Sequence, residues 1–137
     1  MFKIDWPTIE EVVEPRLNIQ AAWVFGSGSG GNIMPGSDLD IAVWFVEHPS
    51  LDELAFLRES LQRALNFDDI DIVTLNSASP ITRFEAVSGH VVFKRDAGKV
   101  AGFVSLTARE YEDCMALLRR GLAWARESEK VVEQISR

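Results

Sequence analysis

The chain has 137 residues, 47% of them hydrophobic and 26% charged, with a formal net charge of −7. This size and composition predict a single folded domain, 1–137, with one hydrophobic core, and they exclude intrinsic disorder. Because no apolar run approaches the ~20 residues that span a bilayer, and the N-terminus lacks a secretory signal, we expect no membrane association. The only cysteine, Cys114, fits a reducing cytoplasm, and the acidic balance disfavours direct binding of long nucleic acids.

Capping residues and apolar periodicity place helices and strands alternately along the chain. Asp5 before Trp6-Pro7 is a helix start, as is Ser50 before Glu53, and leucines behind Ser50 recur at helical spacing. Short apolar runs bounded by Gly, Pro, Asn or Asp are typical of buried strands. In chain order we expect helix 5–17, strand 20–25, strand 38–45, helix 50–66, strand 69–75, helix 81–87, strand 90–94 and a long helix that opens at the capping box Thr107–Glu110. This order predicts an α/β domain.

The last helix carries an apolar stripe that consists of Tyr111, Met115, Leu118, Leu122 and Ala125. Packing against the core is the first interpretation of such a stripe. If the stripe proves wider than the domain can cover, the helix would dock the helices of a partner protein. We expect Cys114, on the same helix, to be an inert small hydrophobic residue.

The segment from Gly26 to Gly31 reads Gly-Ser-Gly-Ser-Gly-Gly and formally satisfies the dinucleotide-binding pattern G-x-G-x-x-G. That fingerprint also requires a helix opened by the loop, whereas the next strand is expected as early as Asp38. The P-loop pattern fails as well, because no Gly-Lys-Ser/Thr ends the loop. The glycines taken alone are compatible with a flexible connection between strands. At the end of the loop, 34–37 (Met-Pro-Gly-Ser) fits a type I or type II turn.

Two carboxylates stand at the mouth of the predicted strand 38–45. Residues two apart face the same side of a strand, so Asp38 and Asp40 would lie roughly 6–7 Å apart at the Cα atoms. Two divalent cations that bridge both carboxylates to phosphate oxygens would relieve their repulsion. The alternative is a solvated strand end, at which Asp38 caps the turn and Asp40 faces water. The apolar run after Asp40 favours the metal site, because it places the pair beside the core.

A third carboxylate is available on the predicted strand 69–75. Asp71 lies between Ile70 and Ile72, and we expect it to complete one metal site and to accept the proton of an attacking hydroxyl. Asp69 is the alternative, but its position at the start of the strand favours solvation. Asp71 is therefore the preferred residue.

A known motif matches these residues. Gly26-Ser27, ten intervening residues and Asp38-Leu39-Asp40, with a later aspartate on a strand, resemble the DNA polymerase β-like nucleotidyltransferase superfamily. The short chain as a whole looks like the minimal nucleotidyltransferases (MNT proteins). The resemblance implies a small mixed sheet of about four strands flanked by helices, with a long C-terminal helix. It also implies that Gly26 and Ser27 open a short helix against a triphosphate.

The same resemblance implies the roles of the site residues. Gly26, Ser27 and Ser37 would contact the nucleotide, while Asp38, Asp40 and Asp71 would bind two Mg²⁺ ions. Asp71 would also activate the nucleophile that attacks the α-phosphate of ATP and expels pyrophosphate.

The resemblance further implies a partner. Similar MNT proteins are commonly antitoxins that attach AMP from ATP to a tyrosine of a HEPN-domain toxin, an all-helical RNase. We therefore expect a hetero-oligomer with such a toxin. One alternative is an antitoxin that neutralises its partner by binding alone. Another is nucleotidylation of a small molecule such as an aminoglycoside, which is less favoured because so short a chain has no obvious second domain to hold that acceptor.

The loop departs from its relatives in one respect. Relatives often carry a basic residue directly after the Gly-Ser pair, whereas this chain continues with Gly28 and Ser29. A cation for the triphosphate would then come from Arg83, Lys94 or Arg95. The competing interpretation of each is an ordinary surface charge.

Overall fold

The computed structural model describes residues 1–136, except the side chains of Ala123, Ser128 and 131–136. The helices and strands follow one another as β1 (Phe2–Lys3), α1 (Trp6–Val13), β2 (Ile19–Phe25), η1 (Gly26–Gly28), β3 (Asn32–Ile33), β4 (Leu39–Phe45), α2 (Leu51–Leu65), β5 (Ile70–Thr74), η2 (Leu75–Ser77), α3 (Pro80–Val87), β6 (His90–Lys94) and α4 (Ala97–Ser136), where η marks a 3₁₀ turn. No helix among the described residues is long and apolar enough to cross a membrane.

The main sheet has four strands in the order β5-β4-β2-β6. β2 pairs antiparallel with both β4 and β6, while β4 and β5 run parallel and are joined through α2. The expected α/β fold with a mixed sheet of about four strands is therefore confirmed. A second, two-stranded sheet of β1 and β3 was not expected, because strands of two residues carry no periodic apolar pattern.

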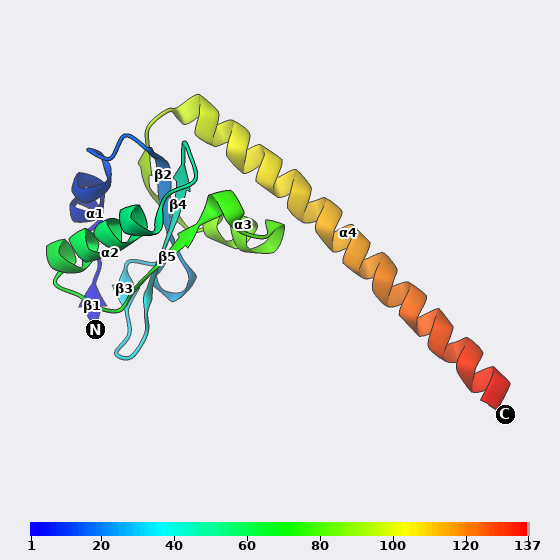
Figure 1. Ribbon diagram of the computed structural model, residues 1–137. Helices are drawn as coiled ribbons and strands as arrows, with labels where there is room; N and C mark the ends of the chain where they lie inside the picture. The colour runs from blue at the N-terminus through cyan, green and yellow to red at the C-terminus, as the bar shows by residue number, and fades with distance from the viewer. Residues whose placement is uncertain (137) are drawn as a thin grey trace.

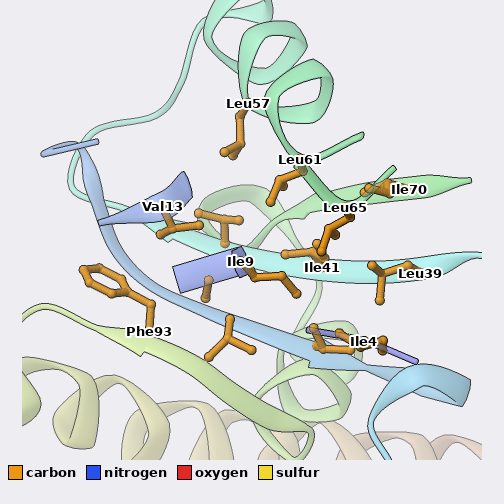
Figure 2. Close-up of a cluster of buried hydrophobic side chains, with 14 of the residues drawn as sticks. Ile4, Ile9, Val13, Leu39, Ile41, Leu57, Leu61, Leu65, Ile70 and Phe93 are labelled. Carbon is orange, nitrogen blue, oxygen red and sulfur yellow. The ribbon is translucent and has the colours of Figure 1, made fainter. Parts of the chain in front are cut away.

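Helices α1 and α2 cover one face of the main sheet. Their apolar side chains, and Ile4 from the N-terminal segment, meet those of the central strands in one buried cluster (Figure 2). Three of the leucines predicted at helical spacing, Leu57, Leu61 and Leu65, are buried there, and Leu54 packs against the cluster. α1 ends at Val13 rather than near Leu17, since Pro15 follows its C-cap residue, Glu14, and cannot continue the helix.

The opposite face of the sheet is covered by α3 and by the beginning of α4. Trp23 and Trp44 stand on this face, and the ring of Phe103 from α4 stacks on Trp44 with centroids 4.3 Å apart. Val100 of α4 is buried in the same cluster. This second core fixes the start of α4 against the sheet.

The long helix begins ten residues before the expected Thr107. The carboxylate of Asp96 accepts hydrogen bonds from the backbone N–H groups of Gly98 (3.0 Å) and Lys99 (3.1 Å), so Asp96 caps the helix. Packing of the first turns on the two tryptophans offsets the helix-weakening effect of Gly98 and Gly102. Thr107 lies inside the helix with 1% of its surface exposed, and its prediction as the start was wrong.

The apolar stripe of α4 is only partly used by the core. Tyr111 stacks on Phe84 of α3, whereas Leu118 and Leu122 are 49% and 61% exposed. Leu117 and Trp124 are exposed as well, at 63% and 74%. Figure 1 shows why: α4 leaves the body of the domain and projects far beyond it. Core packing was therefore the wrong interpretation for the distal part of the stripe.

Candidate active site

Two aspartates meet at one end of the main sheet. Asp40 on β4 and Asp71 on β5 occupy the same register position of the parallel pair, so they are direct neighbours across the strands. Asp40 lies on the sheet face that carries Trp44 and is covered by α3 and α4. Asp38 precedes β4 by one residue and is exposed, as is Asp71. The predicted carboxylates thus gather at one end of the sheet.

Asp71, and not Asp69, is the residue that faces Asp40. Asp69 lies outside β5 and contributes its backbone carbonyl oxygen, which accepts a hydrogen bond from Leu39 N at 2.8 Å. The preference for Asp71 over Asp69 thus agrees with the strand register.

The carboxylates repel one another. Burial of the carboxyl raises the pKa of Asp40 above its ordinary value of 3.8, and the negative charges of Asp71 and then Asp38 raise it further. Among the residues described, none of the three forms an ion pair with a lysine or arginine. The charge of this cluster is therefore not compensated by a side chain, and it is open to a cation from solution.

The first residue of the glycine loop lies against this cluster. Gly26 adopts a positive φ of 70°, and a Cβ atom built on it would lie 3.1 Å from Oδ2 of Asp40. The expected short helix is a single 3₁₀ turn, Gly26–Gly28, in which Ser27 is exposed. Ser37 stands at the other end of the loop, where its backbone N–H donates to the Met34 carbonyl oxygen at 3.0 Å and closes a turn.

A pocket of about 570 Å³ opens beside Gly26 and Asp40. Its floor is the end of β2 and β4, and its walls come from one face of α3 and from α4. The wall residues are Ile81, Phe84, Glu85, Ser88 and Tyr111. Sequence reasoning missed this wall, because the contact of Tyr111 with Phe84 depends on how α4 packs on α3.

The three basic residues considered for the triphosphate do not gather at the carboxylates. Arg83 donates to the carbonyl oxygens of Leu75 (2.7 Å) and Asn76 (3.0 Å) and lies 3.5 Å from a carboxylate oxygen of Glu110. It fastens α3 to the turn after β5.

The other two basic residues belong to the opposite end of the sheet. Arg95 donates to the carbonyl oxygen of Ile19 at 2.9 Å. Lys94 pairs with Ala21, four residues before Phe25 at the site end of β2. Arg58 of α2 lines a crevice of about 220 Å³ together with Asp71. No motif connects Arg58 to Asp71 in the sequence, so only the fold reveals it.

The donor set suits Mg²⁺ in chemistry, since carboxylate oxygens are its usual protein ligands. Within the described part of the chain, however, no three histidine, cysteine, aspartate or glutamate side chains are arranged to hold a metal ion. Asp40 and Asp71 on neighbouring strands, with Asp38 directly before β4, therefore offer the donor chemistry of a divalent-cation site.

Comparisons with known proteins agree with this geometry. The sequence profile of the family described as polymerase beta, nucleotidyltransferase, matches residues 7–98, more than half of the chain. The chain belongs to this family of nucleotidyltransferases. No curated protein sequence matches it.

Solved structures resemble it over nearly the whole chain. A chain of a mutant MntA–HpeT toxin–antitoxin has a TM-score of 0.76 at 22% identity, covering 90% of this chain and 99% of that one. A toxin–antitoxin with AMP-PNP has a TM-score of 0.75 at 23% sequence identity, again covering 90% of this chain and 99% of that one. A chain in the complex of a tri-AMPylated Shewanella oneidensis HEPN toxin with MNT antitoxin has a TM-score of 0.68 at 22% sequence identity. The match covers 88% of this chain and 95% of that one. At such identities the likeness concerns the fold.

Proposed function

We propose that this chain is an antitoxin that transfers AMP from ATP to a tyrosine of a HEPN toxin and thereby inactivates it. The observation that carries the proposal is the pair Asp40 and Asp71, in register on neighbouring strands beside Gly26, in a chain of the nucleotidyltransferase family. The structural neighbours support the choice of partner and nucleotide, because they are toxin–antitoxin complexes, one of them with AMP-PNP.

In this proposal the three aspartates would hold two Mg²⁺ ions, which would supply positive charge beside the phosphates. Gly26 and Ser27, both exposed in the turn after β2, and Ser37 contact the triphosphate. Asp71 accepts the proton of the tyrosine hydroxyl. The tyrosine oxygen forms a bond to the α-phosphorus as the bond from that phosphorus to the bridging oxygen breaks, and pyrophosphate leaves.

The distal half of α4 supports the assembly with a second protein. Exposed Leu117, Leu118, Leu122 and Trp124 lie on a helix that projects from the domain. Contiguous apolar side chains of this kind are typical of interaction sites. The formal net charge of −7 suits a basic partner.

The test is transfer of label from α-³²P-ATP to a HEPN protein encoded beside this chain, in the presence of Mg²⁺. We expect labelling by the native chain and none by the double variant Asp38→Asn plus Asp40→Asn. Asp69→Asn is the matched control and should label normally, because Asp69 lies outside β5. Unchanged labelling by the double variant would contradict the assignment of the carboxylates.

A second candidate function is neutralisation of the toxin by binding without turnover. The exposed surface of distal α4 favours it, because that surface lies on the projecting part of the helix and does not require the carboxylates. Survival of cells that express the toxin separates the two functions. Rescue by the native chain alone supports transfer, and equal rescue by the double variant supports binding.

A further inference from the structure

We infer that the pocket between the end of the sheet, α3 and α4 binds the nucleoside of the triphosphate, with the stacked pair Phe84 and Tyr111 as its aromatic wall. The inference rests on the proposed function, since it deepens the assignment of this site to a nucleotide. It concerns the part of the nucleotide that the Gly-Ser and Asp-x-Asp motifs do not reach.

The position of the pocket supports the inference, because the pocket is continuous with the proposed phosphate site. Gly26 and Asp40, the residues of the phosphate and metal end, also line this pocket. The nucleoside of a nucleotide is joined to its α-phosphate by a single ester linkage, so its binding site must be continuous with the phosphate site. Of the pockets described in this structure, this one contains both Gly26 and Asp40.

The order of the strands supports the inference as well, because it separates the nucleotide from the acceptor hydroxyl. In the order β5-β4-β2-β6, Gly26 follows β2 on one side of Asp40, and Asp71 lies on β5 on the other side. The pocket is lined by Gly26 and Asp40 but not by Asp71. The nucleotide therefore enters from the side of β2 and the pocket, and the acceptor hydroxyl approaches along the edge strand β5, where Asp71 and Arg58 line a separate crevice.

The chemistry of the wall carries the third step. Ile81, Phe84 and Glu85 on one face of α3 and its C-cap residue Ser88 recur at helical spacing, which gives the pocket two apolar and two polar side chains. The rings of Phe84 and Tyr111 lie 4.1 Å apart at an interplanar angle of 11°. A flat aromatic surface next to a few polar groups is the usual lining for a nucleobase, and about 570 Å³ is within the range of ligand pockets.

The wall is held in place before any ligand binds. The ion pair of Arg83 with Glu110 joins α3 to α4, and the hydrogen bonds of Arg83 to Leu75 and Asn76 join α3 to the sheet. A preorganised wall lowers the entropic cost of ordering the site around a ligand. The position of α4 thus determines both the nucleotide pocket and the direction in which its distal half projects.

The test measures binding of ATP and of AMP to the full chain by equilibrium dialysis. AMP is measured in the presence of Mg²⁺, so that the carboxylates do not repel its phosphate, and since AMP has no pyrophosphate to release, the readout does not depend on transfer. Glu85→Trp places a large side chain in the pocket from an exposed position of α3. Ala101→Trp is the matched control, because exposed Ala101 lines a different pocket of about 360 Å³ on the same face of the sheet.

We expect Glu85→Trp to weaken the binding of both nucleotides at least tenfold and Ala101→Trp to leave it unchanged. Tyr111→Leu should weaken binding about tenfold, within the range reported for loss of a base-stacking ring, while Tyr111→Phe retains it. Thermal melts of all variants verify folding. Equal affinity of Glu85→Trp and the native chain overturns the inference, even if the chain labels its partner. Loss of AMP binding in Glu85→Trp, with binding retained in Ala101→Trp, supports the inference even if the native chain shows no transfer.

Discussion

Gly26 lies against the carboxylate of Asp40, and a Cβ atom at position 26 would come within 3.1 Å of Asp40 Oδ2. The positive φ of 70° at this position is one that other residues adopt only at a cost. The turn proposed to bind phosphate and the aspartate proposed to bind metal are therefore in direct contact. A change at the glycine must act on the aspartate as well.

The first prediction concerns Gly26→Ala. We expect this variant to lose about 1–2 kcal/mol of folding stability from the left-handed backbone, and to lose most transfer activity because the Asp40 carboxylate must move. Chemical denaturation and the labelling assay measure the two effects. Gly30→Ala is the control, since a Cβ atom there meets nothing within 4 Å and its φ is not in the left-handed region. Normal activity in Gly26→Ala would show that the contact is dispensable.

The second prediction concerns pH and Asp40. Its raised pKa means that the folded state favours the protonated carboxyl, so in the absence of divalent cations this group's contribution to stability is complete below pH 3.8 and is lost as pH rises through the raised pKa. Asp40→Asn avoids this loss of stability, because asparagine carries no charge at any of these pH values. At neutral pH without Mg²⁺ the variant should melt a few degrees higher than the native chain, while transfer is abolished.

Added Mg²⁺ reverses the order of stability in the second prediction. The ion should raise the melting temperature of the native chain and leave that of Asp40→Asn nearly unchanged. The control is Asp69→Asn, which should respond to Mg²⁺ as the native chain does. A melting temperature of Asp40→Asn below the native value in metal-free buffer would contradict the electrostatic account of the cluster.

The third prediction concerns the close packing of Gly89 between α3 and β6. A Cβ atom at this position would lie 2.4 Å from the carbonyl oxygen of Val24, so the end of β2 must shift. Gly89→Ala should lower the free energy of unfolding by about 1–3 kcal/mol, which is the usual effect of overpacking a core. In contrast, Gly102→Ala in α4 should raise the free energy of unfolding by about 0.5–1 kcal/mol, because a Cβ atom at this position meets no other atom within 4 Å. Urea denaturation of both variants tests this difference in sign.

The fourth prediction concerns distal α4. The double variant Leu118→Glu plus Leu122→Glu should keep the folding stability of the chain within about 0.5 kcal/mol, because both side chains are exposed. It should weaken the association with the HEPN partner about tenfold or more, as measured by titration calorimetry. Leu51→Glu, at an 85% exposed leucine on α2, is the matched control and should bind normally. Native affinity in the double variant would mean that the partner docks elsewhere.

Most of the fold could be predicted from local patterns. The strands β2, β4, β5 and β6 lie within one residue of their predicted bounds at each end, because each is a short apolar run between turn residues. The starts of α1 and α2 follow their caps, and the side chains of Asp5 and Ser50 accept the expected hydrogen bonds. The start of α4 was missed because tertiary packing on Trp23 and Trp44 overrides the weak helical signal of its first turns.

The candidate site was predictable to a different degree for each residue. Asp38 and Asp40 were found from their spacing and from the core strand behind them. Asp71 was favoured over Asp69 by its position between two isoleucines, and the register agrees. Phe84 and Tyr111, which line the pocket beside Asp40, and Arg58, which lines a crevice with Asp71, were not predicted, because helix packing that no local pattern describes decides their positions.

The sequence by itself determined the glycine turn, the two aspartates at the mouth of a core strand and the alternation of helices and strands, because these features depend on neighbours within a few residues. Only the tertiary structure decided that Asp71 stands beside Asp40, that Phe84 and Tyr111 form one wall, and that the apolar side chains of α4 from Leu117 to Trp124 that the structure describes are left exposed. These follow from strand order, register and helix packing, which are set by burial of apolar surface across the whole domain.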